Sequence, residues 1–329
     1  MAARHTWLVM AVIAVCMTGC RPGPPSHAER PALPLILASV ATPYSGLIAI
    51  AETQGYFEKV GLDLTVRLYP SGLDALTAMR RGDAGAATVA DIAFAVAMAE
   101  DPSLRVLAGI GASSGSEMVA RKDRGIHSPS DLRGKRVGYS PGSSSAYYLH
   151  SFLLTNRLSR QDITAVPVVA SRQVETVISG EVDAVAAIDI YAFAAKKALG
   201  ANAIAWDIQN TLDYQWLLAT RTLEARPREA IERFLSALVM AEEFAVNHEE
   251  ETKSILVEHW GIDADFIRYS WSRTRLSVSF NQSIVTALQT YLQWHAGAGG
   301  RAGVSPDVIR HLDIGPLEAV DSRLVTVFR

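Results

Sequence analysis

The sequence predicts an α/β fold built from two lobes, and three observations support this prediction. The chain has 329 residues, more than one hydrophobic core usually organises. From Leu35 onward, short apolar runs alternate with helical patterns. One of these stretches recurs in register 98 residues later, so both halves of the pattern carry related segments.

The first lobe is predicted from a βαβαβ order. We expect strands over residues 35–40, 64–68 and 84–89, and helices over residues 46–57 and 72–81. Strands that are joined through helices run parallel and form a central sheet.

The same order predicts the second lobe, with strands over residues 136–139, 165–169 and 182–188, and helices over residues 144–158 and 172–179. We assign lobe I to residues 35–115 and 208–329, and lobe II to residues 116–207. The chain then crosses near residues 115–120 and returns near residues 206–217. We expect these two crossovers to act as a hinge.

The C-terminal third is predicted to add extra helices to lobe I. Apolar residues follow helical spacing over residues 227–247 and 281–295. Ser305 and Pro306 predict the start of another helix, with a capping serine followed by proline at the first helical position.

The repeat aligns Leu76 to Asp91 with Val174 to Asp189 without a gap. Gly82 and Gly180 each follow a predicted helix, where glycine takes the left-handed conformation that ends it. The repeat therefore predicts one helix, turn, strand and helix start in each lobe. The alternative is chance similarity between two alanine-rich stretches.

Residues 1–19 are interpreted as a lipoprotein signal peptide. Arg4 precedes an apolar run from Trp7 to Met17, which is shorter than the roughly 20 residues needed to cross a bilayer. The segment ends Met17-Thr18-Gly19-Cys20 and resembles the lipobox of bacterial lipoproteins, with Met where Leu is commonest. We expect export, lipidation of Cys20 and anchoring at the periplasmic side or cell surface. The alternative is an ordinary secretory leader with an incidental cysteine.

Residues 20–34 are predicted to form a tether, because they are rich in proline and too polar to join a core. The chain has two cysteines. Cys16 would leave with the leader and Cys20 would carry the lipid, so we expect no disulfide in the folded body.

The composition argues against a nucleic-acid partner. The formal net charge is −3, and no basic run is present. Proteins that bind nucleic acids gain most of their affinity from Lys and Arg residues that neutralise phosphates. The hydrophobic content of 49% also excludes a disordered chain.

Four segments carry a resemblance to a known family: residues 51–64, 71–76, 81–85 and 130–138. They are similar to the nitrate/taurine/alkanesulfonate and thiamine-precursor family of solute-binding proteins of ABC importers. The resemblance covers about residues 35–295. It implies a type II periplasmic-binding-protein fold with a hinge and an interlobe cleft, which closes on a solute and delivers it to a permease with its ATPase. Gly85 departs from the family, in which many members have Asp; Asp183 keeps that residue in the second lobe.

Candidate ligand contacts follow the predicted strands, because ligands of α/β sheets bind beyond the carboxyl ends of strands. In the first lobe, Tyr44 either stacks on a flat solute or lies in a surface turn. Thr88 offers a hydroxyl, whereas Asp91 either contacts the ligand or caps its helix. Ser71, in a segment that carries the resemblance, is a further candidate.

Ser143, Ser144 and Ser145 form the strongest candidate in the second lobe. They stand between a strand and a helix, where hydroxyls and backbone N–H groups suit a sulfonate, phosphonate or carboxylate. The resemblance implies that ligands lie against this loop. The alternative is a capped helix whose serines face solvent. Asp189 has the same two interpretations as Asp91.

Three further candidates follow from position alone. Arg172 opens a helix above the cleft and either meets an anion or is solvated. The return segment places Tyr214 and Trp216 near the hinge, and Trp216 is either a ligand contact or a core residue.

No catalytic motif is found in the sequence. It contains no Gly-x-Ser-x-Gly elbow, no phosphate-binding loop and no His-Glu-x-x-His pair. Residues 109–115 miss the dinucleotide-binding spacing and are interpreted as a loop between lobes. Residues 248–251 are interpreted as a solvated helix face.

The sequence therefore predicts a monomeric, lipid-anchored solute-binding protein without catalytic residues, metal or cofactor. The expected ligand is either a small anion of the sulfonate or nitrate type, or a heteroaromatic molecule of the pyrimidine-precursor type. The alternatives are a tethered ligand sensor and an enzyme on the same fold.

Overall fold

The computed structural model describes residues 32–208, 214–222, 225–297 and 307–328. The predicted leader, Cys16, Cys20 and the predicted helix start at Ser305 and Pro306 therefore lie outside the described residues. Within those ranges, no helix combines the length and apolar composition needed to cross a bilayer.

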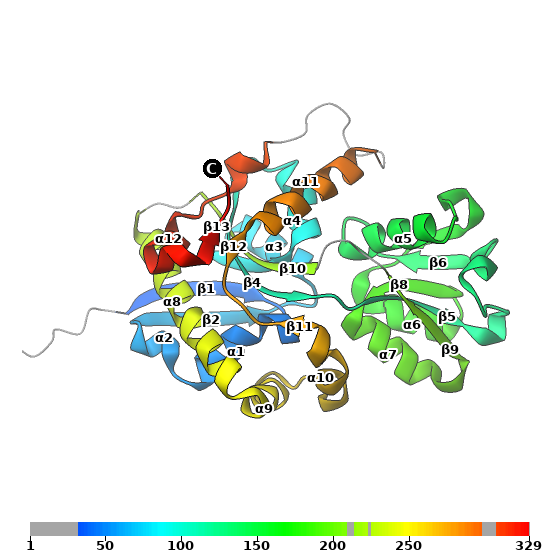
Figure 1. The fold of residues 1–329 in the computed structure, drawn as a ribbon, viewed down its shortest axis with the longest axis horizontal. Helices are drawn as coiled ribbons and strands as arrows, with labels where there is room; N and C mark the ends of the chain where they lie inside the picture. Colours follow the sequence, from blue (N-terminus) through cyan, green and yellow to red (C-terminus); the bar gives the residue numbers. More distant parts are fainter. Residues whose placement is uncertain (1–31, 209–213, 223–224, 298–306, 329) are drawn as a thin grey trace, which may run out of the picture. The chain divides into compact units, whose positions relative to one another are not determined.

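Two sheets organise the described chain (Figure 1). The six-stranded sheet has the order β11-β4-β10-β3-β1-β2, with bounds β1 Leu33–Ser39, β2 Leu62–Leu68, β3 Ala86–Ala90, β4 Leu104–Ser113, β10 Tyr214–Arg221 and β11 Thr274–Arg275. The five-stranded sheet has the order β7-β6-β8-β5-β9, with bounds β5 Ser116–Arg121, β6 Arg136–Tyr139, β7 Thr164–Pro167, β8 Ala184–Ile188 and β9 Ala203–Asp207. A small pair joins β12 Phe280–Asn281 to β13 Val325–Thr326.

The helices connect and cover these sheets. Their bounds are α1 Gly46–Thr53, α2 Tyr56–Lys59, α3 Gly72–Arg81, α4 Asp91–Met98, α5 Ser144–Thr155, α6 Gln173–Ser179, α7 Asp189–Leu199, α8 Ala225–Asn247, α9 Glu249–Trp260, α10 Ala264–Ser270, α11 Gln282–Gly297 and α12 Gly315–Asp321. The predicted C-terminal helices pack against the helices that cover the six-stranded sheet: α8 contacts α1, and α11 contacts α4.

Each sheet combines three neighbouring parallel strands with further strands, of which β5 and β10 are the ones that the chain enters from the other sheet. β2, β1 and β3 run parallel, as do β7, β6 and β8. β4 leads into β5 at residues 114–115, and β9 leads towards β10 between Asp207 and Tyr214. β10 then pairs antiparallel with β3, and β5 pairs antiparallel with β8. The chain therefore passes twice between the sheets.

The repeat is confirmed by the structure. β3 and β8, which stand 98 residues apart, have matching bounds, and α4 and α7 begin at Asp91 and Asp189. Gly82 and Gly180 end α3 and α6 with φ angles of 88° and 78°. The same local unit is therefore built into both sheets.

Two predicted boundaries in the first part of the chain are corrected. The predicted tether extends to residue 34, but β1 begins at Leu33. Leu33 donates its N–H to the Gly61 carbonyl on the β2 side of the strand. The N–H that Pro34 lacks would point to the opposite side, towards β3. Pairing with β3 starts only at Leu37, so proline costs no hydrogen bond of the sheet at this position. The predicted helix 46–57 is split into α1 and α2 by Gly55, which is left-handed with φ 65°.

The predicted loop over residues 109–115 is also wrong for its first five residues, which belong to β4. Its glycines reflect close packing. A Cβ on Gly111 would lie 2.2 Å from the carbonyl oxygen of Tyr44, and Gly109 exchanges two backbone hydrogen bonds with Ser279. Glycine in a strand often marks such a close approach of another backbone.

The Gly85 departure has a structural explanation. Asp183 accepts hydrogen bonds from the backbone and guanidinium of Arg136, at 2.9 and 2.8 Å. Gly85 donates its N–H to Ile36, just as Asp183 donates its N–H to Arg136. The first sheet therefore has isoleucine at the position of Arg136. Because isoleucine has no guanidinium to pair with, a carboxylate at position 85 would have no charged partner there.

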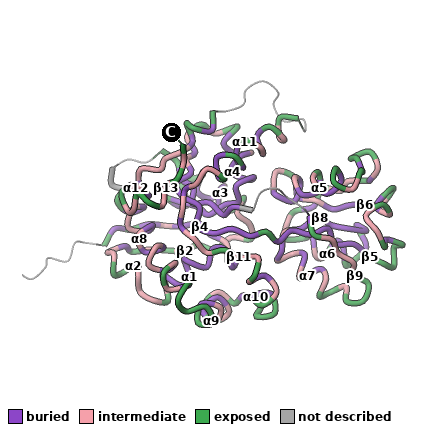
Figure 2. The backbone as a smooth tube through the Cα atoms, viewed as in Figure 1, coloured by how far each residue is buried: buried purple, intermediate pink, exposed green. Residues whose placement is uncertain are grey.

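The strands at the centre of both sheets are buried (Figure 2). All residues of β3 are buried, and α8 supplies Ile231, Phe234, Leu235 and Leu238 to the core, as its helical spacing predicted. Phe234 stacks on Phe57 of α2, with ring centroids 5.6 Å apart.

Replacement of Gly111 by alanine is expected to lower the free energy of unfolding by about 2 kcal/mol or more, because a methyl group forced into a packed site displaces backbone. Urea denaturation measures the change. Gly297→Ala is the control, since a Cβ there meets nothing within 4 Å, and should stay within about 0.5 kcal/mol of wild type. Equal stability of the two variants would contradict the packing argument.

Candidate functional site

A cavity of about 420 Å³ lies at the carboxyl ends of parallel strands from both sheets. The segments after β1, β2, β6 and β7 contribute to its lining, as do the β3–α4 and β8–α7 junctions, and β10 adds Trp216. This is the position at which open α/β sheets bind ligands. Within the described chain, the lining holds neither Lys nor Arg nor His, and its one charged side chain is Asp74.

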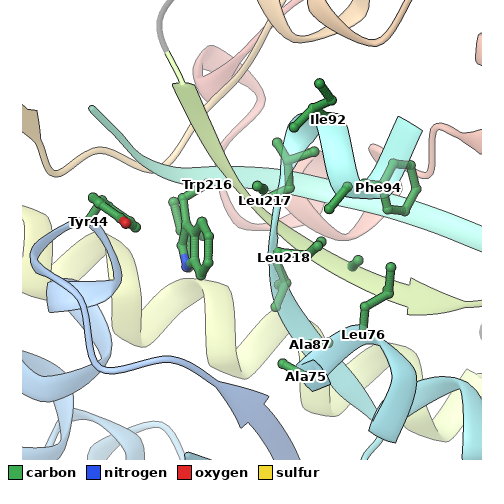
Figure 3. Close-up of a cluster of buried hydrophobic side chains, with 14 of the residues drawn as sticks. Tyr44, Ala75, Leu76, Ala87, Ile92, Phe94, Trp216, Leu217 and Leu218 are labelled. Carbon is green, nitrogen blue, oxygen red and sulfur yellow. The ribbon is translucent and has the colours of Figure 1, made fainter. Parts of the chain in front are cut away.

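Tyr44 and Trp216 line the cavity and form its aromatic wall. Figure 3 shows the two rings beside one another. Their ring centroids lie 5.1 Å apart, with an angle of 59° between the ring planes. Tyr44 is only 1% exposed, so its interpretation as a surface turn is wrong. Trp216 is 2% exposed and combines both alternatives, since it belongs to the core and also lines the cavity.

The three serines at the start of α5 have different surroundings. The Ser145 hydroxyl makes several hydrogen bonds: it donates to the Ala186 carbonyl at 2.6 Å and accepts the N–H of Ser140 at 2.9 Å. Ser143 donates to the Ser140 carbonyl at 2.8 Å. Ser144 is 3% exposed, lines the cavity, and its hydroxyl makes no hydrogen bond to any residue that the structure describes. The alternative of a capped helix with serines in solvent is wrong, because Ser144 and Ser145 are buried and the Ser143 hydroxyl caps no N–H.

Asp91 and Thr88 lie behind the cavity wall. The Asp91 carboxylate accepts the Ile92 N–H of its own helix at 2.7 Å and the Gln215 N–H of β10 at 3.0 Å. Its burial raises its pKa to about 7, against the lowering effect of these hydrogen bonds. The hydroxyl of Thr88 bonds to that of Ser39 at 2.9 Å. Neither residue lines the cavity.

Asp189 has the corresponding position in the five-stranded sheet. Its carboxylate accepts the Ile190 N–H of its own helix at 2.8 Å and the Ser113 hydroxyl, at the end of β4, at 2.9 Å. Burial raises its pKa to about 6. Asp91 and Asp189 therefore tie the starts of α4 and α7 to the two strands that pass between the sheets.

The loop after β2 brings Ser71 into the cavity lining. Ser71 caps α3 by accepting the Asp74 N–H at 3.2 Å and donates its own proton to the Asp74 carboxylate at 2.6 Å. Across from this loop, the Tyr191 hydroxyl donates to the Pro70 carbonyl at 3.2 Å. The side chain of Tyr214 lies outside the described residues.

The sequence analysis missed Gln173, which is 1% exposed and lines the cavity. Its amide nitrogen donates to the Ser145 hydroxyl at 2.9 Å and to the Ala186 carbonyl at 3.1 Å. Its position just beyond β7 was the available signal, since that loop obeys the same rule as the others. The neighbouring Arg172 does not line the cavity, and its guanidinium lies 3.2 Å from Glu175 and 3.7 Å from Glu181.

The site offers hydrogen bonding and apolar contact. Among the described residues, no group of three or more His, Cys, Asp or Glu side chains is placed to hold a metal ion. Residues 248–251 are exposed at the start of α9, away from the cavity lining.

The chain forms two α/β sheets, passes twice between them and leaves a cavity at the carboxyl ends of their parallel strands. This is the fold of periplasmic solute-binding proteins. The chain belongs to the NMT1/THI5-like family, whose model matches residues 42–252. No curated protein sequence matches the chain.

Three solved structures illustrate the fold. The alkanesulfonate-binding protein SsuA of Xanthomonas axonopodis pv. citri, bound to MOPS, is 16% identical with a TM-score of 0.72, over 86% of this chain and 99% of that one. The periplasmic aliphatic sulphonate-binding protein SsuA of Escherichia coli is 20% identical with a TM-score of 0.67, over 80% and 87%. The desulfurization enzyme DSZB is 16% identical with a TM-score of 0.63, over 88% and 99%. At these identities the likeness concerns the fold.

The raised pKa of Asp91 predicts a pH-dependent stability. The folded state holds the proton up to about pH 7, whereas the unfolded chain releases it near 3.8, so wild type loses stability as pH rises through this window. At about 1.4 kcal/mol for each pKa unit, the loss reaches about 4 kcal/mol. Asp91→Asn lacks this titration. Chemical denaturation from pH 4 to pH 8 should therefore show the advantage of wild type over the variant shrinking up to pH 7 and then staying constant, while parallel curves would contradict it.

Proposed function

We propose that the protein is the solute-binding component of an ABC importer and that it binds a small anionic or heteroaromatic solute in the cavity. The observation that carries this proposal is the lining of the cavity, which comes from the carboxyl ends of the strands of both sheets. The chain also belongs to the NMT1/THI5-like family. The names of the alkanesulfonate-binding neighbours favour the anionic class, and the Tyr44 and Trp216 wall favours a flat ring.

Binding works by closure of two lobes, residues 35–115 with 208–329 and residues 116–207. A solute that touches both walls only in the closed form shifts the population towards that form. We assign the hinge to the two crossings, residues 114–115 and the segment between Asp207 and Tyr214, of which residues 209–213 lie outside the described chain. The hydrogen bond from Tyr191 to Pro70 supports this proposal, because it joins a lining residue of one lobe to a lining residue of the other.

Direct ligand contacts are assigned to Tyr44, Ser71, Ser144, Gln173 and Trp216. All five line the cavity. Thr88, Asp91 and Asp189 are assigned a supporting role, because their side chains bond to neighbouring strands and helices. Ser145 positions the first turn of α5, and Ser143 supports the same loop.

The solute is passed unchanged to a permease and its ATPase. A lipid on Cys20 holds the exported monomer at the membrane, on the periplasmic side or the cell surface, through the proline-rich tether. The desulfurization enzyme with this fold defines the second candidate, an enzyme. Mass spectrometry of the solute recovered from the protein separates the two, since a binding protein returns it without chemical change.

A thermal-shift screen of sulfonates, nitrate, carboxylates, carboxamides and pyrimidines tests the binding function. A solute that binds only the native state raises the melting temperature. At least one of these classes should do so and be recovered intact. Absence of any shift across the screen, or recovery of an altered compound, would contradict the proposal.

Ser144→Ala should weaken solute binding about threefold to tenfold, because one hydrogen bond contributes about 0.5–1.5 kcal/mol. Its melting temperature should stay close to wild type, since Ser144 bonds to no described residue. Titration calorimetry measures the affinity. Ser254→Ala is the control, as that exposed hydroxyl donates to Glu250 in α9 and should leave binding unchanged. Equal affinities of the two variants would remove Ser144 from the site.

Cys20→Ala tests the anchor. In cells, the wild type should fractionate with membranes and carry acyl mass on Cys20, whereas the variant should lose both properties. Membrane fractionation with intact-mass spectrometry measures this. A variant that stays in the membrane fraction would contradict lipid anchoring.

A further inference from the structure

We infer that the cavity selects a neutral solute that presents a hydrogen-bond donor beside an acceptor, as a carboxamide or lactam does, and that Gln173 recognises the donor. This inference rests on the proposed solute-binding function and, of the ligand classes proposed there, excludes the anionic one. It is carried by the hydrogen bonds of Gln173 and Ser144 and by the charges around the cavity.

The orientation of the Gln173 amide is fixed by its partners. One of its two terminal atoms lies 3.1 Å from the Ala186 carbonyl oxygen and 2.9 Å from the Ser145 hydroxyl. A carbonyl oxygen only accepts hydrogen bonds, so the atom facing Ala186 must be the amide nitrogen. The Ser145 proton is given to the same carbonyl, so the nitrogen also donates to Ser145.

This orientation leaves the amide oxygen Oε1 of Gln173 as an acceptor for the ligand. No described residue donates to it, although the side chain is 1% exposed and lines the cavity. Oε1 is not among the buried atoms that lack a partner, so it is open to the cavity, where a donor on the ligand can bond to it. An anionic oxygen at this position would instead face a lone pair.

Hydrogen-bond donors lie in the same wall of the cavity as this acceptor. The Ser144 hydroxyl has no described partner, and no side chain caps the first N–H groups of α5. Ser145 follows Ser144 in the chain and bonds to Gln173, and both Ser144 and Gln173 line the cavity, so the donor group and the acceptor group belong to one wall. A ligand that matches both carries an acceptor and a donor. A carboxamide has this pair, whereas a carboxylate or sulfonate has acceptors alone.

The charges of the lining agree with a neutral ligand. In the described part of the lining, Asp74 is the charged side chain, and it is negative. The nearby guanidinium of Arg172 lies against Glu175 and Glu181 instead. A buried anion without a cationic partner pays a large desolvation cost, which neutral groups avoid. The Tyr44 and Trp216 wall then accommodates an apolar or aromatic body.

The test compares ligands that share one skeleton. Benzamide, benzoate and benzenesulfonate, and likewise nicotinamide, nicotinate and pyridine-3-sulfonate, are titrated into the exported chain without its leader, by thermal shift and calorimetry. The carboxamides should bind at least tenfold more tightly than their matched anions. Their N,N-dimethyl derivatives, which lack the N–H donor, should lose at least tenfold in affinity.

The outcomes separate this inference from the proposed function. Anions that bind as tightly as the carboxamides, or dimethylamides that bind as tightly as the parent amides, would overturn the inference. If sulfonates bind and no carboxamide does, the inference fails while solute binding stands. If no solute of any class binds, both fail.

A variant adds a second test. Gln173→Met keeps the length of the side chain and removes both Oε1 and Nε2, so carboxamide affinity should fall at least fivefold and by more than the affinity of the dimethylamide, which has no N–H to give to Oε1. Gln161→Met, at an exposed position of the same part of the chain, is the control and should bind as wild type. An unchanged affinity in a folded Gln173→Met would overturn the assignment. If that variant does not fold, the comparison of amide with dimethylamide in wild type decides.

Discussion

The cavity depends on two buried carboxyl groups that tie helix starts to the strands passing between the sheets. Asp91 joins α4 to β10, and Asp189 joins α7 to the end of β4. Each carboxyl is desolvated, which raises its pKa, and each remains because it satisfies a backbone N–H of its own helix and a group of a crossing strand. The loops that line the cavity extend from these fixed points, so the geometry of the site follows from this pair.

Within this frame, Ser145 organises the wall of the five-stranded sheet. Its hydroxyl connects the loop before α5, the β8 carbonyl at Ala186 and the amide of Gln173. Its own hydrogen-bonding capacity is thereby used, and Ser144 and the Gln173 oxygen are left for a ligand. One side chain thus explains why adjacent serines have different roles, and why an amide in the next loop has a defined orientation.

The selectivity that follows rests on neutral groups. A family member with alkanesulfonate-binding neighbours would be expected to bind an anion, and the N-terminus of α5 agrees with that expectation. The lining places a carboxylate at Asp74 and an uncommitted amide oxygen at Gln173, and both disfavour an anion. We infer that these side chains decide the ligand class, because all ligands of either class would meet the same helix terminus.

The sequence by itself determined the α/β class, the repeat at 98 residues, the helix-ending glycines and the loops in which a ligand would lie, because these depend on local periodicity and backbone conformation. It did not determine β4, because the glycines at positions 109 and 111 are typical of a loop. It also did not determine which polar residues face the cavity. Asp91 bonds to a residue 124 positions away, and Asp189 to one 76 positions away. Tertiary structure alone decided that these carboxyls turn inward while Ser144 and Gln173 line the cavity, because hydrogen-bond partners so distant in sequence are set only when the sheets assemble.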